Sequence, residues 1–160
     1  VNMTNPADSH DHPIWQFSYT YDASLPADRY DHSAGQGDEV CSVQGIQPGA
    51  PCSVLNAADG HTYVSSMAGD GNHLCCVLPV DVGPVRPDWL ARGGGRDLGV
   101  QQVRGMAADV WTVKGQYVNY YASLPANGSR PLRYWEHKGR LLKQWDFLLE
   151  TYRLGQVDAS

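Results

Sequence analysis

The chain lacks the long apolar runs, catalytic signatures and lysine-rich stretches that mark several large protein classes. No apolar run approaches the roughly 20 residues that a membrane-spanning helix needs, so we expect no transmembrane segment. It contains no Gly-x-Ser-x-Gly elbow, phosphate-binding loop, His-Glu-x-x-His motif or dinucleotide fingerprint. We therefore predict that the protein is not an enzyme and uses no cofactor. Nucleic acid is a poor partner, because the aromatic residues are not interleaved with a dense basic stripe.

Cysteine is scarce and confined to the first half of the chain, at Cys41, Cys52, Cys75 and Cys76. No Cys-x-x-Cys pair is present, so a zinc site is not indicated. Two disulfides are the better interpretation. A bond between the adjacent Cys75 and Cys76 would strain the backbone, so we expect each of them to bond to Cys41 or Cys52.

Disulfides predict a secreted or otherwise extracytoplasmic protein, in the secretory pathway or an organelle lumen. Two Asn-x-Ser/Thr matches, at Asn2 and Asn127, agree with glycosylation on such a route. The second match is also a turn signal, because Gly128 follows Asn127. The first residue is Val1 rather than Met, which suggests that a leader was removed.

Basic residues are few in the first half of the chain. Residues 1–85 carry ten acidic and one basic side chain, a net charge of -9, and residues 86–160 carry seven acidic and eleven basic, a net charge of +4. Opposite net charges in the two halves would allow ion pairs between them if they fold into one sheet, which is one interpretation. The difference also suits a basic half that faces anionic lipid head groups or an acidic partner.

The length fits one compact domain, which we place at residues 14–155 between a flexible N-terminal tail, 1–13, and a C-terminal tail, 156–160. The N-terminal tail contains His10 and His12, so weak binding of a transition metal is an alternative to a plain tail.

Alternation of apolar and polar residues predicts strands at 14–21, 61–67, 73–80 and 101–111. The stretch from Asp22 to Gly60 is predicted to be irregular and tied by disulfides. A short helix is expected from Asp88. Gly93 to Gly95 should end it in a flexible loop.

Aromatic residues concentrate in residues 109–155, which hold nine of the sixteen. Period-two alternation continues through this stretch, and turn signals at 114–115, 125–129 and 138–139 divide it. We predict a meander of about four antiparallel strands. A helix over Arg140 to Tyr152 is the competing interpretation, because its leucines also fit helical spacing.

Three histidines, His61, His73 and His137, lie on predicted strands. Strand histidines are more often hydrogen-bonded structural groups than metal ligands, but a metal-dependent enzyme stays open as a third hypothesis.

The segment from Met106 to Gly155 resembles the ependymin-related part of the LolA-like lipid-binding superfamily. The resemblance is carried by Ala108-Asp109-Val110-Trp111, Tyr120-Tyr121-Ala122-Ser123-Leu124-Pro125, Pro131-Leu132-Arg133-Tyr134-Trp135 and Gln144-Trp145-Asp146-Phe147. It implies a mainly β fold, a curved antiparallel half-barrel with helices or loops across its concave side, which holds an acyl chain or another hydrophobic ligand. This sequence has no clear long helix, so we expect a curved antiparallel sheet with irregular disulfide-tied loops and little helix. The resemblance implies no catalytic residues.

The larger apolar side chains on one face of such strands are where a lipid or other hydrophobic small molecule would lie. The residues predicted to contact it are Trp111, Tyr121, Tyr134, Trp145, Phe147 and Leu149. The same face is equally compatible with a packed core. In that case the protein would be a structural or accessory subunit that docks onto a larger extracellular or lumenal assembly.

Overall fold

The structure is a computed structural model that describes residues 2–4, 15–22, 24–33, 40–41, 46, 49–67, 73–78, 84–115, 117–125, 130–138 and 141–153. Its contacts divide the chain into two compact units, Val1–Ile14 with Asp88–Gly155 and Trp15–Pro87 with Gln156–Ser160. Each unit is built on an antiparallel sheet, which confirms the mainly β prediction. A single domain over residues 14–155 stays a prediction.

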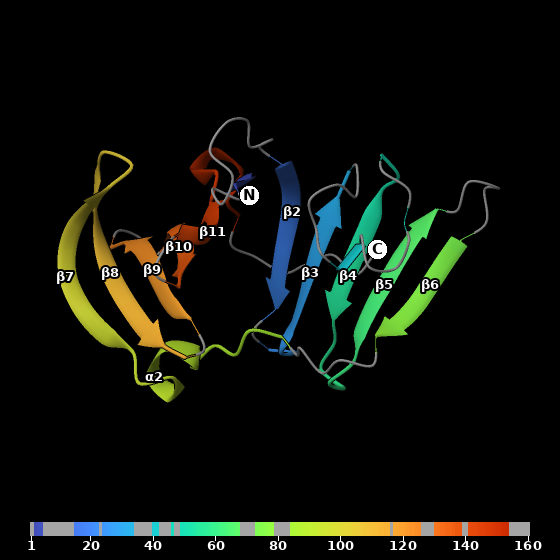
Figure 1. The fold of residues 1–160 in the computed structure, drawn as a ribbon, viewed down its shortest axis with the longest axis horizontal. Helices are drawn as coiled ribbons and strands as arrows, with labels where there is room; N and C mark the ends of the chain where they lie inside the picture. Colours follow the sequence, from blue (N-terminus) through green and yellow to red (C-terminus); the bar gives the residue numbers. More distant parts are fainter. Residues whose placement is uncertain are drawn as a thin grey trace. The chain divides into compact units, whose positions relative to one another are not determined.

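The unit that begins at Trp15 is a meander in which each strand pairs with the next one along the chain (Figure 1). Its strands are β2 (Trp15–Asp22), β3 (Ala27–His32), β4 (Cys52–Asn56), β5 (Thr62–Met67) and β6 (His73–Leu78). The predicted strands at 14–21, 61–67 and 73–80 are therefore confirmed to within two residues.

Two strands of this unit lie in the stretch that the sequence predicted to be irregular. β3 and β4 pair with each other, so the prediction for Asp22 to Gly60 is wrong over these residues. The reason is that β3 places Asp28 and His32 on its buried side, where the alternation rule expects apolar residues.

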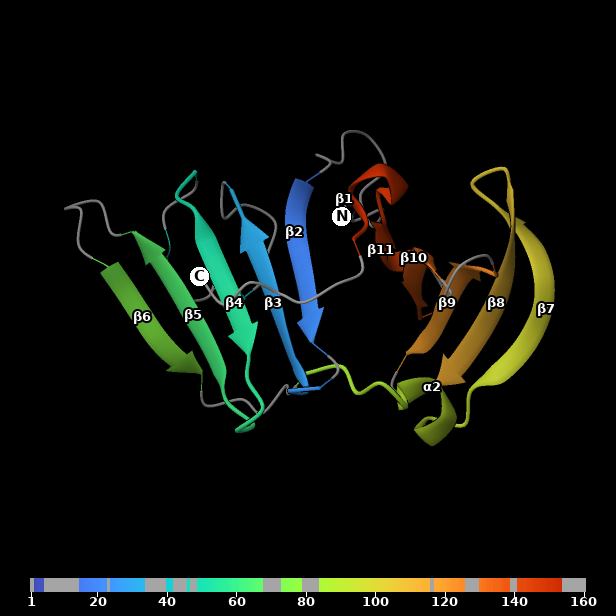
Figure 2. The same cartoon turned by 180° about the vertical axis from the view of Figure 1, so that it is seen from behind.

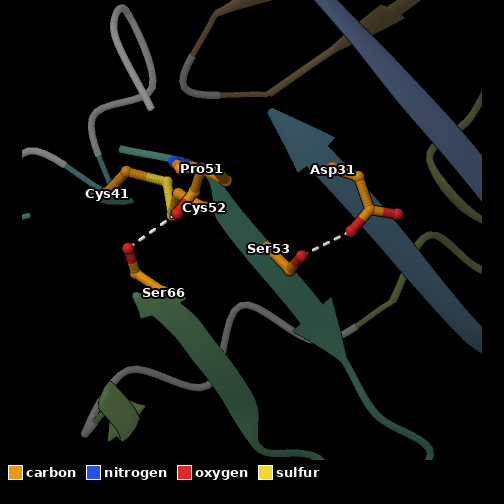
Figure 3. The surroundings of a disulfide bond; sticks show 6 residues. All are labelled: Asp31, Cys41, Pro51, Cys52, Ser53 and Ser66. Atoms are coloured by element: carbon orange, nitrogen blue, oxygen red, sulfur yellow. Dashed lines mark hydrogen bonds between the residues drawn. A yellow bond between two sulfur atoms is a disulfide. The ribbon is translucent and has the colours of Figure 1, made fainter. Parts of the chain in front are cut away.

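One disulfide joins Cys41 to Cys52 across a Cα–Cα distance of 6.3 Å (Figure 3). Both cysteines are buried in a cluster with Val54, Val64 and Leu78. Beside the bond, the Ser66 hydroxyl donates to the carbonyl oxygen of Pro51 at 2.6 Å. The disulfide therefore ties the segment before β4 to the core of its sheet.

The predicted pairing of Cys75 and Cys76 with the other two cysteines is wrong, because both are free thiols. The sheet order explains this. β5 lies between β4, which carries Cys52, and β6, which carries Cys75 and Cys76. Strands two apart are separated by about 10 Å, beyond the roughly 7 Å that a disulfide bridges.

The unit that contains Asp88–Gly155 is a second meander, joined at its edge by β1. Its elements are β1 (Asn2–Thr4), α2 (Trp89–Arg92), β7 (Arg96–Val103), β8 (Met106–Lys114), β9 (Val118–Leu124), β10 (Arg130–His137), β11 (Leu141–Asp146) and a 3₁₀ turn, η1 (Leu149–Thr151). β7 to β11 pair in chain order, and β1 pairs with β11. Three residues of the expected N-terminal tail thus form a strand, because an edge strand offers unpaired backbone groups.

Two predictions for this unit are confirmed, since the meander is present and α2 begins directly after Asp88. The single strand predicted at 101–111 is wrong, because a turn at Arg104 and Gly105 divides it between β7 and β8. The helical alternative for Arg140 to Tyr152 is wrong over β11, which is extended and paired on both sides. Among the residues that the structure describes, no helix combines the length and apolar character needed to cross a bilayer.

The core of this unit lies on one face of its sheet. The buried cluster consists of Val103, Ala108, Val110, Ala122 and Leu132. Arg104, at a φ of 53°, forms the turn between β7 and β8, and its Nη1 donates to the carbonyl oxygen of Phe147 at 2.8 Å. This bond connects the first turn of the meander to the segment after its last strand.

Candidate functional site: an aromatic row on one sheet face

Four predicted ligand-binding residues form one continuous line across β8 to β11. Trp111 is directly opposite Tyr121, Tyr121 is opposite Tyr134, and Tyr134 is opposite Trp145. Residues directly opposite in neighbouring strands share a sheet face, with Cβ atoms about 4.5–5.5 Å apart. We call these four residues the aromatic row.

The aromatic row lies on the face away from the buried core. Val110 and Ala122 are chain neighbours of Trp111 and Tyr121, and both are fully buried members of the core cluster. Successive strand residues point to opposite faces. The four row residues are all only partly buried, which distinguishes them from the core on the other face.

A fifth aromatic residue, Trp89 of α2, packs against the middle of the aromatic row. Its ring centroid is 6.0 Å from that of Tyr121 and 6.4 Å from that of Tyr134, both in edge-on geometry. Figure 1 and Figure 2 both show α2 beside the ends of β8 and β9. Sequence reasoning missed Trp89, because it lies on a four-residue helix outside the strand alternation.

Two glycines after α2 have contacts that exclude larger residues. A Cβ at Gly93 would lie 2.6 Å from Cγ1 of Val113, and one at Gly95 would lie 2.5 Å from the carbonyl oxygen of Leu90. The predicted flexible loop is instead a close turn. It holds α2 against β8, and so it positions Trp89.

Two tyrosines of the row stay protonated at neutral pH. Burial, followed by the nearby Tyr152, raises the pKa of Tyr121 to about 12. Burial also raises the pKa of Tyr134, and its hydroxyl donates to Oε1 of Glu136 at 2.6 Å, which raises that pKa further. The centre of the row is therefore uncharged.

The other face of the same strands carries its own aromatic pair. Tyr120 and Trp135 stack with centroids 5.2 Å apart and an interplanar angle of 7°, and Trp135 packs against the core cluster. These aromatics are already engaged in packing. The aromatic row, by contrast, places large apolar rings on the face opposite the core cluster, a face on which Val113 is also buried.

Residues 22–155 match the model of a family described as a domain of unknown function, DUF8395. The chain belongs to this family. A search of curated proteins found no match. Because the family description includes no activity, function in this DUF8395 protein has to be argued from its geometry.

The structure does not place Phe147 and Leu149 with the aromatic row. Leu149 packs against the core cluster on the other face. Phe147 follows the end of β11, where its backbone N–H donates to the carbonyl oxygen of Leu132 at 3.1 Å. The alternation that assigned both to one face with Trp145 stops when β11 ends at Asp146.

The three strand histidines considered for a metal site are dispersed in this DUF8395 chain. His61 is exposed beside Asp59, His73 is exposed on β6, and His137 contacts the ring of Tyr120. Within the described ranges, no three His, Cys, Asp or Glu side chains gather as metal ligands would. The predicted glycosylation residue Asn2 is on β1, and Asn127 is outside the described residues.

A buried polar ladder in the other sheet was also missed by sequence reasoning. Asn56 donates to Oδ1 of Asp28 at 2.7 Å, Thr62 donates to Oδ1 of Asn56 at 2.7 Å, and the backbone N–H of Val85 donates to Oδ2 of Asp28 at 3.0 Å. Burial raises the pKa of Asp28 despite these bonds. Polar residues in alternation give no sequence signal of burial, so only the structure identifies the ladder.

Proposed function

We propose that this DUF8395 protein binds a lipid or similar hydrophobic molecule on the aromatic row, without catalysis, in an extracytoplasmic compartment. The observation that carries the proposal is the register itself, which aligns Trp111, Tyr121, Tyr134 and Trp145 on a face apart from the core. Trp89 packs against the middle of this line.

The chemistry of the row suits an elongated apolar ligand. Tryptophan and tyrosine each offer a large rigid apolar surface at little cost in side-chain entropy. A line across four strands spans about 14 Å at the usual strand spacing, close to the length of an alkyl chain of about ten carbons. The protonated tyrosines add no charge that would oppose an apolar body.

Two further observations support the compartment and the ligand class. The Cys41–Cys52 disulfide is typical of an oxidising environment. The segment that carries the aromatic row is also the one whose sequence resembles the LolA-like lipid-binding superfamily.

The proposal is tested with methyl decanoate, a ligand with an apolar chain and no charged head. Titration followed by tryptophan fluorescence should show saturable binding, and Tyr121→Ser should weaken it by about tenfold, as loss of about 1.4 kcal/mol of contact predicts. Tyr120→Ser is the matched control, because it removes the same side chain from the other face of the same strand. No binding, or equal weakening by the two substitutions, would overturn the proposal.

A second candidate function is docking of this protein as an accessory subunit, favoured by the surface of β6. On this strand Leu74 is 36% exposed and Val77 is 54% exposed, and Cys75 between them is an exposed free thiol. Exposed apolar residues on an edge strand suit addition of a strand from a partner. Val77→Lys should abolish a co-purifying assembly if this candidate is correct and leave methyl decanoate binding unchanged.

A further inference from the structure

A row of polar side chains lies next to the aromatic row on the same sheet face. Asn119 is directly opposite Val113 on one side and Glu136 on the other, and Glu136 is opposite Lys143. Each of these residues is two positions from a member of the aromatic row, so the two rows share a face. A ligand on the aromatic row would therefore have polar groups along one side.

Asn119 carries the observation that points to a ligand. Its side-chain Oδ1 is buried and accepts no hydrogen bond from the residues that the structure describes. A buried acceptor without a donor destabilises the folded state. The oxygen is enclosed in this conformation, so a donor on a bound molecule would satisfy it after the amide group turns toward the open sheet face.

The charged residues near Asn119 indicate which charge the head group of a bound molecule would carry. The Glu136 carboxylate accepts from the Tyr134 hydroxyl, and the Lys143 ammonium lies 5.7 Å from the ring centroid of Trp145. A carboxylate head could pair with the Lys143 ammonium, but it would also face two acceptors, the negatively charged Glu136 carboxylate and Asn119 Oδ1. A hydroxyl can donate to either acceptor, and its oxygen can accept from Lys143.

We propose that the aromatic row and Asn119 together select a single-chain amphiphile with a neutral hydroxyl-bearing head, such as a monoacylglycerol. This inference rests on the proposed function, since it places the chain of the same ligand on the aromatic row. The chain lies along the aromatic row, and the head turns sideways from it onto Asn119 and Glu136, which flank Tyr121 and Tyr134.

The experiment compares three ligands with one chain length: 1-decanoylglycerol, methyl decanoate and decanoate. The wild-type protein should bind 1-decanoylglycerol about tenfold more tightly than methyl decanoate, as one hydrogen bond to a buried acceptor predicts. Decanoate should bind most weakly. In Asn119→Leu, whose new side chain has nearly the same shape, the affinity for 1-decanoylglycerol should fall to the affinity for methyl decanoate.

A second measurement separates ligand recognition from folding. Asn119→Leu removes the buried acceptor, so its midpoint of urea unfolding should equal or exceed that of the wild type. Equal affinity of the wild type for 1-decanoylglycerol and methyl decanoate would overturn this inference and leave the proposed function intact. Tightest binding of decanoate would also overturn it, and binding of none of the three would overturn both.

Discussion

The two sheets share one topology, a meander of five consecutive strands, yet they are stabilised by different means. The sheet of β2 to β6 buries a disulfide, a few aliphatic residues and the Asp28–Asn56–Thr62 ladder. The sheet of β7 to β11 buries an aliphatic core on one face and has the aromatic row on the other. The difference is that the second sheet aligns a row of large aromatic side chains on the face opposite its aliphatic core cluster.

The largest expected effect is in the core of the aromatic sheet. Leu132 is fully buried among Val110 and Ala122, so Leu132→Ala should lower the free energy of unfolding by about 2–5 kcal/mol, from lost contacts and the cavity left behind. Urea denaturation measures this. Val100→Ala in the same unit is the control, because Val100 is 67% exposed and should change stability by less than about 0.5 kcal/mol.

The stability of the sheet of β2 to β6 should depend on the Cys41–Cys52 disulfide. Replacing both Cys41 and Cys52 with Ala should cost about 3 kcal/mol, because the unfolded chain regains the freedom of an 11-residue loop. Cys75→Ala should be close to neutral in the same denaturation assay. A comparable loss on Cys75→Ala would contradict the structure and restore the disulfide pairing that the sequence pattern favoured.

Trp145→Ala should lower the free energy of unfolding by less than Leu132→Ala does, although tryptophan is the larger side chain. A fully buried tryptophan would cost about 3–5 kcal/mol, but Trp145 is only partly buried, so we expect about 1–2 kcal/mol. Affinity for methyl decanoate should fall in the same variant. A loss of about 3–5 kcal/mol, with ligand affinity unchanged in the folded fraction, would show that the aromatic row is packed core and not a binding surface.

The polar ladder predicts a pH dependence in the first sheet. The folded-state pKa of Asp28 is raised, so between the ordinary carboxyl pKa and this raised value the folded protein binds more protons than the unfolded chain. The contribution of Asp28 to stability is therefore present at acidic pH and is lost as pH rises through the raised pKa. Denaturation from acidic to neutral pH should show this slope, and Asp28→Asn should remove it.

Asp22 is a control, because its contribution to stability should depend on pH in the opposite direction. Hydrogen bonds from the hydroxyl and backbone N–H of Ser24 lower its pKa, so its contribution is lost as pH falls. Asp22→Asn should leave the Asp28 slope in place. If the slope persists in Asp28→Asn and vanishes in Asp22→Asn, the assignment to the ladder is contradicted.

The sequence predicted the aromatic sheet better than the sheet of β2 to β6, for a physical reason. In residues 109–155 the apolar and aromatic residues recur mostly with a period of two, so the strand pattern is visible in the sequence. The turns then set the register between neighbouring strands. In that register, four of the six predicted ligand-binding residues lie in one row.

The remaining features depend on tertiary contacts that no local pattern encodes. β3 buries Asp28, whose hydrogen-bond partner Asn56 lies 28 residues further along the chain. Trp89 joins the site through a turn that needs Gly93 and Gly95 for close approach. Leu149 packs against the core cluster instead of joining the aromatic row, because the alternation stops where β11 ends and a strand's end is its least predictable feature.

The most direct test of the central claim is quenching of tryptophan fluorescence by a brominated fatty acid methyl ester, which quenches only rings that it contacts. Two variants of adjacent strands are compared at saturation, Trp145→Phe from the aromatic row and Trp135→Phe from the core face. If the ligand lies on the aromatic row, the quenched fraction of the emission falls in Trp145→Phe and rises in Trp135→Phe. A fall in Trp135→Phe, or the same fraction in both variants, would contradict the account.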